Sequence, residues 1–312
     1  MEQEHFMSRA LNLAKLGLGK VKTNPMVGCV IVKNNTIISE GFHEKYGEAH
    51  AEVNALKDLN PEQISDAEAF VSLEPCSHFG KTPPCADLLI QSGIKKVTVA
   101  MLDPNPLVAG NGVKKLIDSG IEVKVGLLEK EATSINPVFL HGIKTNTPFI
   151  TLKWAESKDG FIAGEKGSEK ISGIATDLIS HKFRTEVDAI CVGTNTIIKD
   201  NPRLDTRLVS DETKMKVSFG TSQHENYIPI TPKTFKADLK TLYSKYHIGH
   251  LLVEGGQKTL QFFIDQNAFQ QIRIIKSKSN QLNSGTKAPS INFPHLVEQI
   301  ETATDNLYIY AS

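Results

Sequence analysis

Two of the chain's four cysteines, Cys76 and Cys85, lie in one short loop with the sequence SLEPCSHFGKTPPC. They could form a disulfide, be two unrelated thiols, or supply half of a metal site. The other two, Cys29 and Cys191, stand in apolar segments and are expected to be core residues. Four cysteines in 312 residues do not make a secreted disulfide scaffold, and a disulfide is disfavoured in a reducing cytosol.

Upstream of this loop, the segment GEAHAEVNAL places His50 and Glu52 at the start of a predicted helix. A catalytic zinc ion takes three protein ligands and keeps its fourth position for water. His50, Cys76 and Cys85 supply such a set. Glu52 could then take a proton from that water and deliver it to a ring nitrogen or a leaving amine. Zinc deaminases combine H-x-E with P-C-x-x-C, whereas eight residues separate the cysteines here.

A structural zinc ion is the alternative for the same residues. Such a site normally has four protein ligands, and His78 is the candidate for the fourth. An H-x-E pattern also occurs by chance in many proteins, so the spacing favours a catalytic metal without excluding a structural one.

The composition is that of an ordinary globular protein, with 40% hydrophobic and 22% charged residues. The length favours two domains. Basic and acidic residues both total 35, which argues against a general nucleic-acid binder, since those show a basic excess. The N-terminus lacks the basic start and apolar block of a signal peptide, and no apolar run reaches the roughly 18 residues of a membrane span. We therefore expect a cytoplasmic protein.

Strand-like and helix-like segments alternate along the first half. The N-terminus has helical spacing through Phe6, Ala10, Leu13 and Leu18. Alternating strands and helices predict a mainly parallel sheet covered on both faces. The predicted strands lie at 27–33, 69–73, 95–101 and 121–126, and the predicted helices at 50–60, 85–93 and 112–120.

A second series of elements follows Pro148, so we expect domains at 1–146 and 147–312. Its predicted strands lie at 149–157, 187–193 and 249–256, with a helix at 176–186. No G-x-G-x-x-G motif marks a dinucleotide site. Glycines nevertheless end two of these strands, at Gly193 and at Gly255 and Gly256, where ligands of open α/β sheets bind. Arg184 and Arg207 could hold a phosphate, although each could equally be a surface arginine.

At this point the first half resembles the deaminase part of the bifunctional riboflavin biosynthesis deaminase–reductase family. The matching segments are TNPMVGCVIV, GFHEKYGEAHAEVNAL, LEPCSHFGKTPPC and DPNPLVAGNG, and in this family eight residues normally separate the cysteines. The resemblance implies a cytidine-deaminase-like three-layer α/β/α domain that acts on a diaminopyrimidinone ribosylamine phosphate. By position, His50, Cys76 and Cys85 would bind Zn²⁺ and Glu52 would be catalytic. The substrate would contact Asn24, His43, His78 and Lys81.

The second half resembles the reductase part of the same family in LKWAESKDGFIA, DAICVGTNTIIKDNPRLDTR and LLVEGG. This implies a dihydrofolate-reductase-like α/β domain that uses NADPH to reduce a ribosyl group to ribityl. The substrate would contact Ser168, Arg184, Leu204, Arg207 and Glu254. The coenzyme would contact Ala155, Lys170, Thr196, Asp200 and Gly256.

One departure concerns the interval between Arg207 and Glu254, which is shorter than in the family and polar. The pattern of a strand is missing from it. Loss of that strand would remove NADPH contacts and expose a sheet edge, and NADPH oxidation would then be weak or absent.

The leading hypothesis is therefore a zinc-dependent deaminase fused to an NADPH-dependent reductase of riboflavin biosynthesis. It would act on small phosphorylated pyrimidines, without nucleic acid or membrane, as a homodimer or homotetramer. One alternative is a deaminase whose decayed second domain only binds substrate or supports oligomerisation. Others are a nucleic-acid or nucleoside deaminase and a non-catalytic scaffold with a structural zinc ion.

Overall fold

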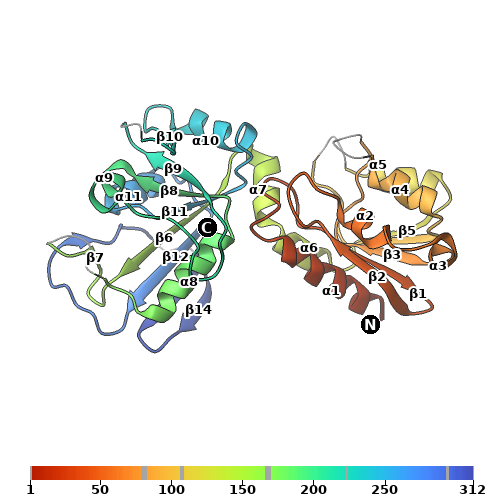
Figure 1. Ribbon diagram of the computed structural model, residues 1–312, viewed down its shortest axis with the longest axis horizontal. Coiled ribbons are helices and arrows are strands. Elements are labelled where there is room, and N and C mark those ends of the chain that lie inside the picture. The colour runs from red at the N-terminus through yellow and green to blue at the C-terminus, as the bar shows by residue number, and fades with distance from the viewer. Residues whose placement is uncertain are drawn as a thin grey trace. The chain divides into compact units, whose positions relative to one another are not determined.

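The computed structural model describes residues 2–78, 83–105, 109–165, 170–221, 224–292 and 295–311. The chain forms two compact units, Met1–Thr145 and Asn146–Ser312 (Figure 1). Within the described residues, none of the helices has both the length and the apolar character needed to cross a membrane. Each unit is built around its own sheet and its own hydrophobic core.

The sheet of the first unit has the order β2-β1-β3-β4-β5. Strand β1 is antiparallel to both of its neighbours, while β3, β4 and β5 are parallel. The expectation of a mainly parallel sheet holds for this unit except at β1, which runs opposite to the other four strands. The missed strand is β2, which is half exposed and too polar to show an apolar run. The strands are β1 (Gly28–Lys33), β2 (Thr36–Phe42), β3 (Glu68–Val71), β4 (Lys96–Val99) and β5 (Glu122–Val125).

The hairpin between β1 and β2 turns at Asn34 and Asn35, whose φ angles are 50° and 61°. Two successive residues with positive φ are what a two-residue hairpin turn requires, and asparagine tolerates that conformation better than most residues. The pair thus reverses the chain directly after β1.

Helices cover both faces of this sheet. Side chains of β1 alternate between the faces, so Cys29 and Ile31 pack with α2, α4 and α5, whereas Val30 and Val32 pack with α1, α6 and α7. The three-layer α/β/α arrangement is confirmed. The helices are α1 (Glu2–Ala14), the 3-10 turn η1 (Lys15–Gly17), α2 (Ala51–Leu56), α3 (Pro61–Ile64), α4 (Cys85–Ser92), α5 (Asn111–Asp118), α6 (Glu129–Ile135) and α7 (Pro137–Thr145).

The helical spacing expected at the N-terminus is confirmed for three of its four residues by helix α1. Phe6, Ala10 and Leu13 are buried, but the helix ends at Ala14, and Leu18 is 45% exposed. Gly28 of β1 explains how closely the helix approaches the sheet. A Cβ atom at this position would lie 2.0 Å from the carbonyl oxygen of Ala10, so only glycine fits.

The second unit contains a sheet in the order β10-β9-β8-β11-β6-β12-β15-β14. From β10 to β12 the neighbouring strands are parallel, and β15 is antiparallel to both β12 and β14. The strands are β6 (Phe149–Glu156), β8 (Ala189–Gly193), β9 (Met215–Phe219), β10 (Ile228–Ile230), β11 (His250–Val253), β12 (Gln271–Ser277), β14 (His295–Glu301) and β15 (Asp305–Ala311).

Helices also pack on this sheet. Helices α10 and α11 belong to one core cluster, and α8 belongs to a second one that includes alternate residues of the same strands. A two-stranded sheet pairs β7 with β13. These elements are α8 (Ile174–Thr185), α9 (Thr194–Asp200), α10 (Phe235–Ser244), α11 (Gln257–Asp265), β7 (Phe161–Ala163) and β13 (Thr286–Lys287).

The interval between Arg207 and Glu254 has not lost its sheet strands, and that expectation is wrong. It contains β9 and β10 as well as α10, and β9 pairs in parallel with β8. The strands are short, and only a few side chains such as Val217 and Ile230 are fully buried, so their apolar signal is weak. Pro229 within β10 is tolerated because β10 is an edge strand.

Candidate metal centre and active site

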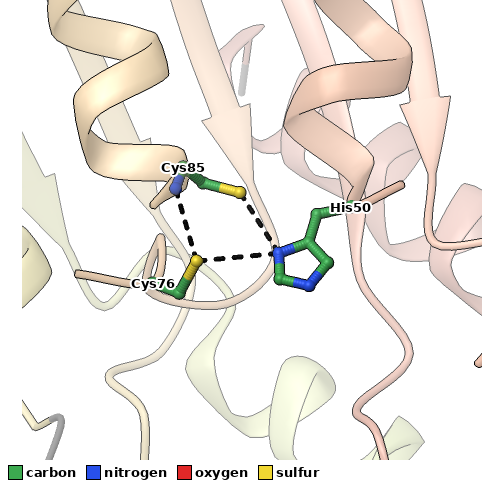
Figure 2. A group of neighbouring side chains, drawn as sticks. All are labelled: His50, Cys76 and Cys85. Carbon is green, nitrogen blue, oxygen red and sulfur yellow. Dashed lines mark hydrogen bonds between the residues drawn. The ribbon is translucent and has the colours of Figure 1, made fainter. Parts of the chain in front are cut away.

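Three side chains that lie far apart in the sequence converge at one end of the first sheet (Figure 2). His50 is the N-cap residue of α2, Cys85 is the first residue of α4, and Cys76 lies in the segment that follows β3. The Nδ1 atom of His50 is 3.2 Å from Sγ of Cys85 and 3.6 Å from Sγ of Cys76. The three candidate ligand atoms all lie within 4.8 Å of one another.

This geometry fits a zinc ion. Zinc–sulfur bonds of about 2.3 Å and zinc–nitrogen bonds of about 2.0–2.1 Å at a tetrahedral angle place the two ligand atoms about 3.6 Å apart. The distance from His50 to Cys76, 3.6 Å, matches that value, and the distance to Cys85, 3.2 Å, is somewhat shorter. Thiolate and imidazole ligands are also typical of zinc. Among the described residues the ligand group has three members, and His78 is not one of them, which disfavours a four-ligand structural site.

The two thiols are reduced and electrostatically unequal. All four cysteines are free, so the disulfide interpretation is not supported. The hydrogen bond with Cys85 lowers the pKa of Cys76 to about 4, and the same contact raises the pKa of Cys85. The backbone N–H of Cys85, at the start of α4, also donates to Sγ of Cys76 over 3.3 Å. A helix N-terminus therefore stabilises one thiolate before any metal binds.

Glu52 lies in the first turn of α2 and is only 3% exposed. Burial is the largest cause that raises the pKa of this carboxyl above its ordinary value, which suits it to accept and return a proton. It lines a cavity of about 400 Å³ together with His50 and Cys76. Asn24, His43 and His78 line the same cavity, whereas Lys81 lies outside the described residues.

His43 is held at both ring nitrogens. Its Nδ1 lies 3.0 Å from the carbonyl oxygen of Ala49, which can only accept, so Nδ1 carries the hydrogen. Its Nε2 then accepts from the side-chain amide of Asn24, also at 3.0 Å. Burial lowers the pKa of His43, in keeping with this neutral form. In this state His43 orients Asn24, while its predicted contact with substrate remains a prediction.

The polar residues of the cavity wall that sequence reasoning missed include Asp103 and Asn105. Both belong to the DPNP segment, which follows β4, and burial raises the pKa of Asp103. Ligands of α/β sheets bind beyond the carboxyl ends of parallel strands. Their position after a strand was therefore the signal that could have identified them.

In the second unit, Arg184 and Glu254 form a partly buried pair. Two hydrogen bonds of 2.8 Å join the guanidinium of Arg184 to the carboxylate of Glu254, and Arg184 donates a third over 3.0 Å to the carbonyl oxygen of Asp205. Lys153 on β6 is 3.7 Å from the same carboxylate. The structure thus brings two of the predicted substrate contacts together at the ends of β11 and α8.

The other predicted substrate contacts are distributed around this pair. Arg207 is exposed and makes two contacts, of 2.6 and 2.8 Å, with the carboxylate of Asp205. Leu204 is buried and has a φ angle of 52°, which is unusual for leucine. Ser168 lies outside the described residues. Asp205 therefore connects Arg184 and Arg207 through its backbone and its side chain.

Two of the predicted coenzyme contacts lie close together. Gly256 is the N-cap residue of α11, and a Cβ atom built on it would be 3.9 Å from Oγ1 of Thr196 in α9. Asp200 is the last residue of α9, and Ala155 lies on β6. Lys170 forms an ion pair of 2.6 Å with Asp177 of α8. No contact in the described residues joins Lys170 to the other four.

Glu254 should make the stability of the second unit depend on pH. Burial alone would raise the pKa of this carboxyl, but Lys153 and Arg184 lower it from 4.5 to about 2. Because the pKa is lower in the folded state, the stabilisation is present above pH 5 and is lost as the pH falls towards 2. It amounts to about 3 kcal/mol.

Urea unfolding of the wild-type chain and of Glu254→Gln from pH 7 to pH 3 measures this dependence. We expect Glu254→Gln to be less stable at pH 7 and to lose less stability on acidification. Glu301→Gln is the matched control, because Glu301 is an exposed carboxylate paired with Lys278. Parallel pH curves for wild type and Glu254→Gln would contradict the assignment.

The fold and the site define a zinc-dependent deaminase domain joined to a second α/β domain. Residues 1–101 match the family model of the cytidine and deoxycytidylate deaminase zinc-binding region, and residues 148–277 match that of the RibD C-terminal domain. The riboflavin biosynthesis protein RibD of Aquifex aeolicus is 41% identical over 306 residues, which cover 87% of this chain and 86% of that protein. The chain belongs to the RibD family.

Two further comparisons agree with this assignment. RibD of Actinobacillus pleuropneumoniae is 47% identical over 213 residues, but the match spans only 56% of that protein and 68% of this chain. A solved structure from Thermotoga maritima, described as a diaminohydroxyphosphoribosylaminopyrimidine deaminase/5-amino-6-(5-phosphoribosylamino)uracil reductase, is 33% identical with a TM-score of 0.89. That superposition covers 99% of this chain and 98% of the other.

Family membership assigns the chain to riboflavin biosynthesis, with a zinc-dependent deaminase in the first unit and an NADPH-dependent reductase in the second. The superposition with the Thermotoga structure runs through both units, so the short interval after Arg207 does not mark a missing half-domain. The alternatives, a decayed second domain or a nucleic-acid deaminase, gain no support from the comparisons.

Proposed function

We propose that the first unit hydrolytically deaminates 2,5-diamino-6-ribosylamino-4(3H)-pyrimidinone 5′-phosphate. The second unit then reduces the ribosyl group of 5-amino-6-(5-phosphoribosylamino)uracil with NADPH. The observation that carries the proposal is the convergence of His50, Cys76 and Cys85, with His50, Cys76 and the buried Glu52 lining one cavity. Release of ammonia from the diaminopyrimidinone by the purified, zinc-loaded chain tests it directly.

In the deamination, His50, Cys76 and Cys85 hold the metal. Zinc, when bound, supplies a Lewis acid that makes water nucleophilic at neutral pH. Glu52 accepts one proton from the attacking water and passes it to the ring nitrogen. It then carries the proton of the newly formed hydroxyl to the amine, which leaves as ammonia when the C–N bond breaks. Burial of Glu52 keeps bulk water from competing for that proton. Asn24, oriented by His43, and His78 hold the pyrimidine against the metal, and Lys81 pairs with its phosphate.

In the reduction, the carboxylate of Glu254 binds a polar group of the ribosyl chain while Arg184 and Lys153 hold it in its ionised form. Arg207 exchanges its contact with Asp205 for the phosphate of the substrate, since guanidinium groups bind phosphate with two hydrogen bonds. Ser168 and Leu204 complete the substrate site. Ala155, Lys170, Thr196, Asp200 and Gly256 bind NADPH, whose phosphates lie against backbone amides at the start of the helices.

Several finer features complete the proposal. The substrates are small phosphorylated pyrimidines, the chain works in the cytoplasm as a homodimer or homotetramer, and it takes no nucleic acid as substrate. The absence of a nucleic-acid substrate is supported by the balanced charge of the chain, which has 35 basic and 35 acidic residues.

Reductase activity gives a test of the second unit by itself. Because β9 and β10 are present at the sheet edge, we expect saturable NADPH oxidation with the deaminated substrate, in place of the weak activity expected from the sequence. Absorbance at the NADPH band measures it. Arg184→Ala should lower kcat/KM by about 100-fold, because it leaves the partly buried carboxylate of Glu254 without its main partner.

Lys182→Ala is the matched control for that variant, because Lys182 is an exposed residue of the same helix. It should leave NADPH turnover unchanged. If the wild-type chain releases ammonia but oxidises no NADPH, the deaminase-only alternative replaces the proposal for the second unit.

A further inference from the structure

Glu74 is a buried carboxylate to which the chemistry above gives no role. It lies two residues before Cys76, directly after β3, and is 4% exposed. Its Oε2 accepts backbone N–H groups from Asp103 over 3.1 Å and from Gly110 over 2.9 Å. Its Oε1 accepts two further N–H groups, over 2.8 and 3.2 Å. Both oxygens are therefore fully used in holding backbone.

The two donors to Oε1 are Gly112 and Val113, in the first turn of α5. The first N–H groups of a helix have no partner within the helix and usually bond to an N-cap side chain. Here the N-cap residue is Gly110, which has no side chain to offer. Glu74 supplies the missing acceptor from another element, and its charge suits the positive end of the helix.

The same contacts fix part of the cavity wall. Asp103 and Asn105 line the cavity, and the N–H of Asn105 donates to Oδ1 of Asp103 over 2.8 Å. Since Glu74 binds the N–H of Asp103 and follows directly after β3, it connects this wall to the loop that carries Cys76. We propose that Glu74 is a positioning residue, which places Asp103 and Asn105 for binding the pyrimidine relative to the metal centre.

Gly112 supports this assignment independently. A Cβ atom on Gly112 would lie 2.0 Å from the carbonyl oxygen of Pro75 and 3.2 Å from Oε1 of Glu74. Helix α5 therefore begins in direct contact with the residue before Cys76. The segment that ends at Cys76 and the start of α5 are packed as closely as backbone allows.

The proposal rests on the deaminase function, so the experiment has one readout with activity and one without it. In the zinc-loaded chain, Glu74→Gln should raise KM for the diaminopyrimidinone by about tenfold or more and change kcat by less than about threefold. Glutamine loses acceptors because its amide nitrogen cannot receive an N–H. Zinc content should stay at the wild-type value, since none of the three ligands is changed.

Hydrogen exchange gives the readout that needs no activity. Amide exchange at Gly110 and Gly112 should accelerate about tenfold or more in Glu74→Gln, with exchange in β4 unchanged. Glu68→Gln is the matched control, since Glu68 lies on β3, the strand before Glu74, and contacts Thr98 and Lys96 away from the cavity. It should alter neither KM nor exchange at Gly110.

Gly112→Ala displaces the start of α5 by a different route and should raise KM in the same way. If Glu74→Gln does not fold, the KM of Gly112→Ala tests the positioning role in its place. Unchanged exchange at Gly110 and Gly112, or a lower melting temperature with KM unchanged, would overturn the positioning role. A wild-type chain that releases no ammonia would refute the deaminase function, and the exchange experiment would still decide the role of Glu74.

Discussion

Replacement of Glu52 by glutamine is expected to leave zinc bound and to lower kcat for ammonia release by about 10²–10⁴-fold. The side chain is 97% buried in the cavity beside His50 and Cys76, and burial raises the pKa of its carboxyl. Glutamine has nearly the same shape but cannot accept and return a proton. The loss should therefore fall on kcat, while KM and zinc content stay close to the wild-type values.

An ammonia-coupled assay and elemental analysis of the same preparations measure these quantities. Glu62→Gln is a suitable control, because Glu62 is exposed on α3 of the same unit. It should retain full activity. Turnover by Glu52→Gln at the wild-type rate would remove the proton-transfer role from this residue. Loss of zinc together with activity would show instead that Glu52 supports the metal site.

The metal centre could be predicted from the sequence because its residue types are rare and chemically specific. A histidine, two cysteines and a glutamate in H-x-E and P-C contexts offer few other uses in a reducing compartment. Their convergence also follows from the order of elements. His50 begins α2 and Cys85 begins α4, and helices of α/β units begin beyond the carboxyl ends of strands.

Other parts of the molecule depend on tertiary contacts that leave weak marks in the sequence. Strand β2 pairs with β1, and most of its residues are partly exposed, so its sequence does not contain the apolar run that would predict a strand. Strands β9 and β10 are short, and they are strands because neighbouring strands satisfy their backbone groups. In the sequence, Glu74 cannot be distinguished from any other acidic residue. Only the fold shows that four backbone N–H groups donate to its carboxylate.

Weak sequence signals also explain why the interval between Arg207 and Glu254 was wrongly expected to lack a strand. A polar interval was interpreted as the loss of a strand, but an edge strand has only one neighbour and needs few buried side chains. The edge strand here is β10, which has only three residues and one fully buried side chain, Ile230. Interval length and polarity are therefore poor measures of whether a sheet is complete at its edge.

Substitution of Cys85 by serine should abolish zinc binding and, with it, deamination. Serine shortens the side chain and replaces a thiolate with a hydroxyl, which zinc binds far more weakly. It also replaces the thiol that forms a side-chain hydrogen bond with Cys76. We expect ammonia release to fall by about 100-fold or more, because loss of a direct ligand exceeds the 10–100-fold effect of losing an outer-shell partner.

NADPH oxidation with the deaminated substrate should survive this substitution. Residues 146–312 form a compact unit with cores of their own, and no member of the ligand group lies in it. Cys29→Ala is the matched control, because Cys29 is a fully buried thiol of the same unit outside the ligand group. Zinc retained at one ion per chain in Cys85→Ser would mean that other residues hold the metal, and the mechanism drawn for the first unit would fail with it.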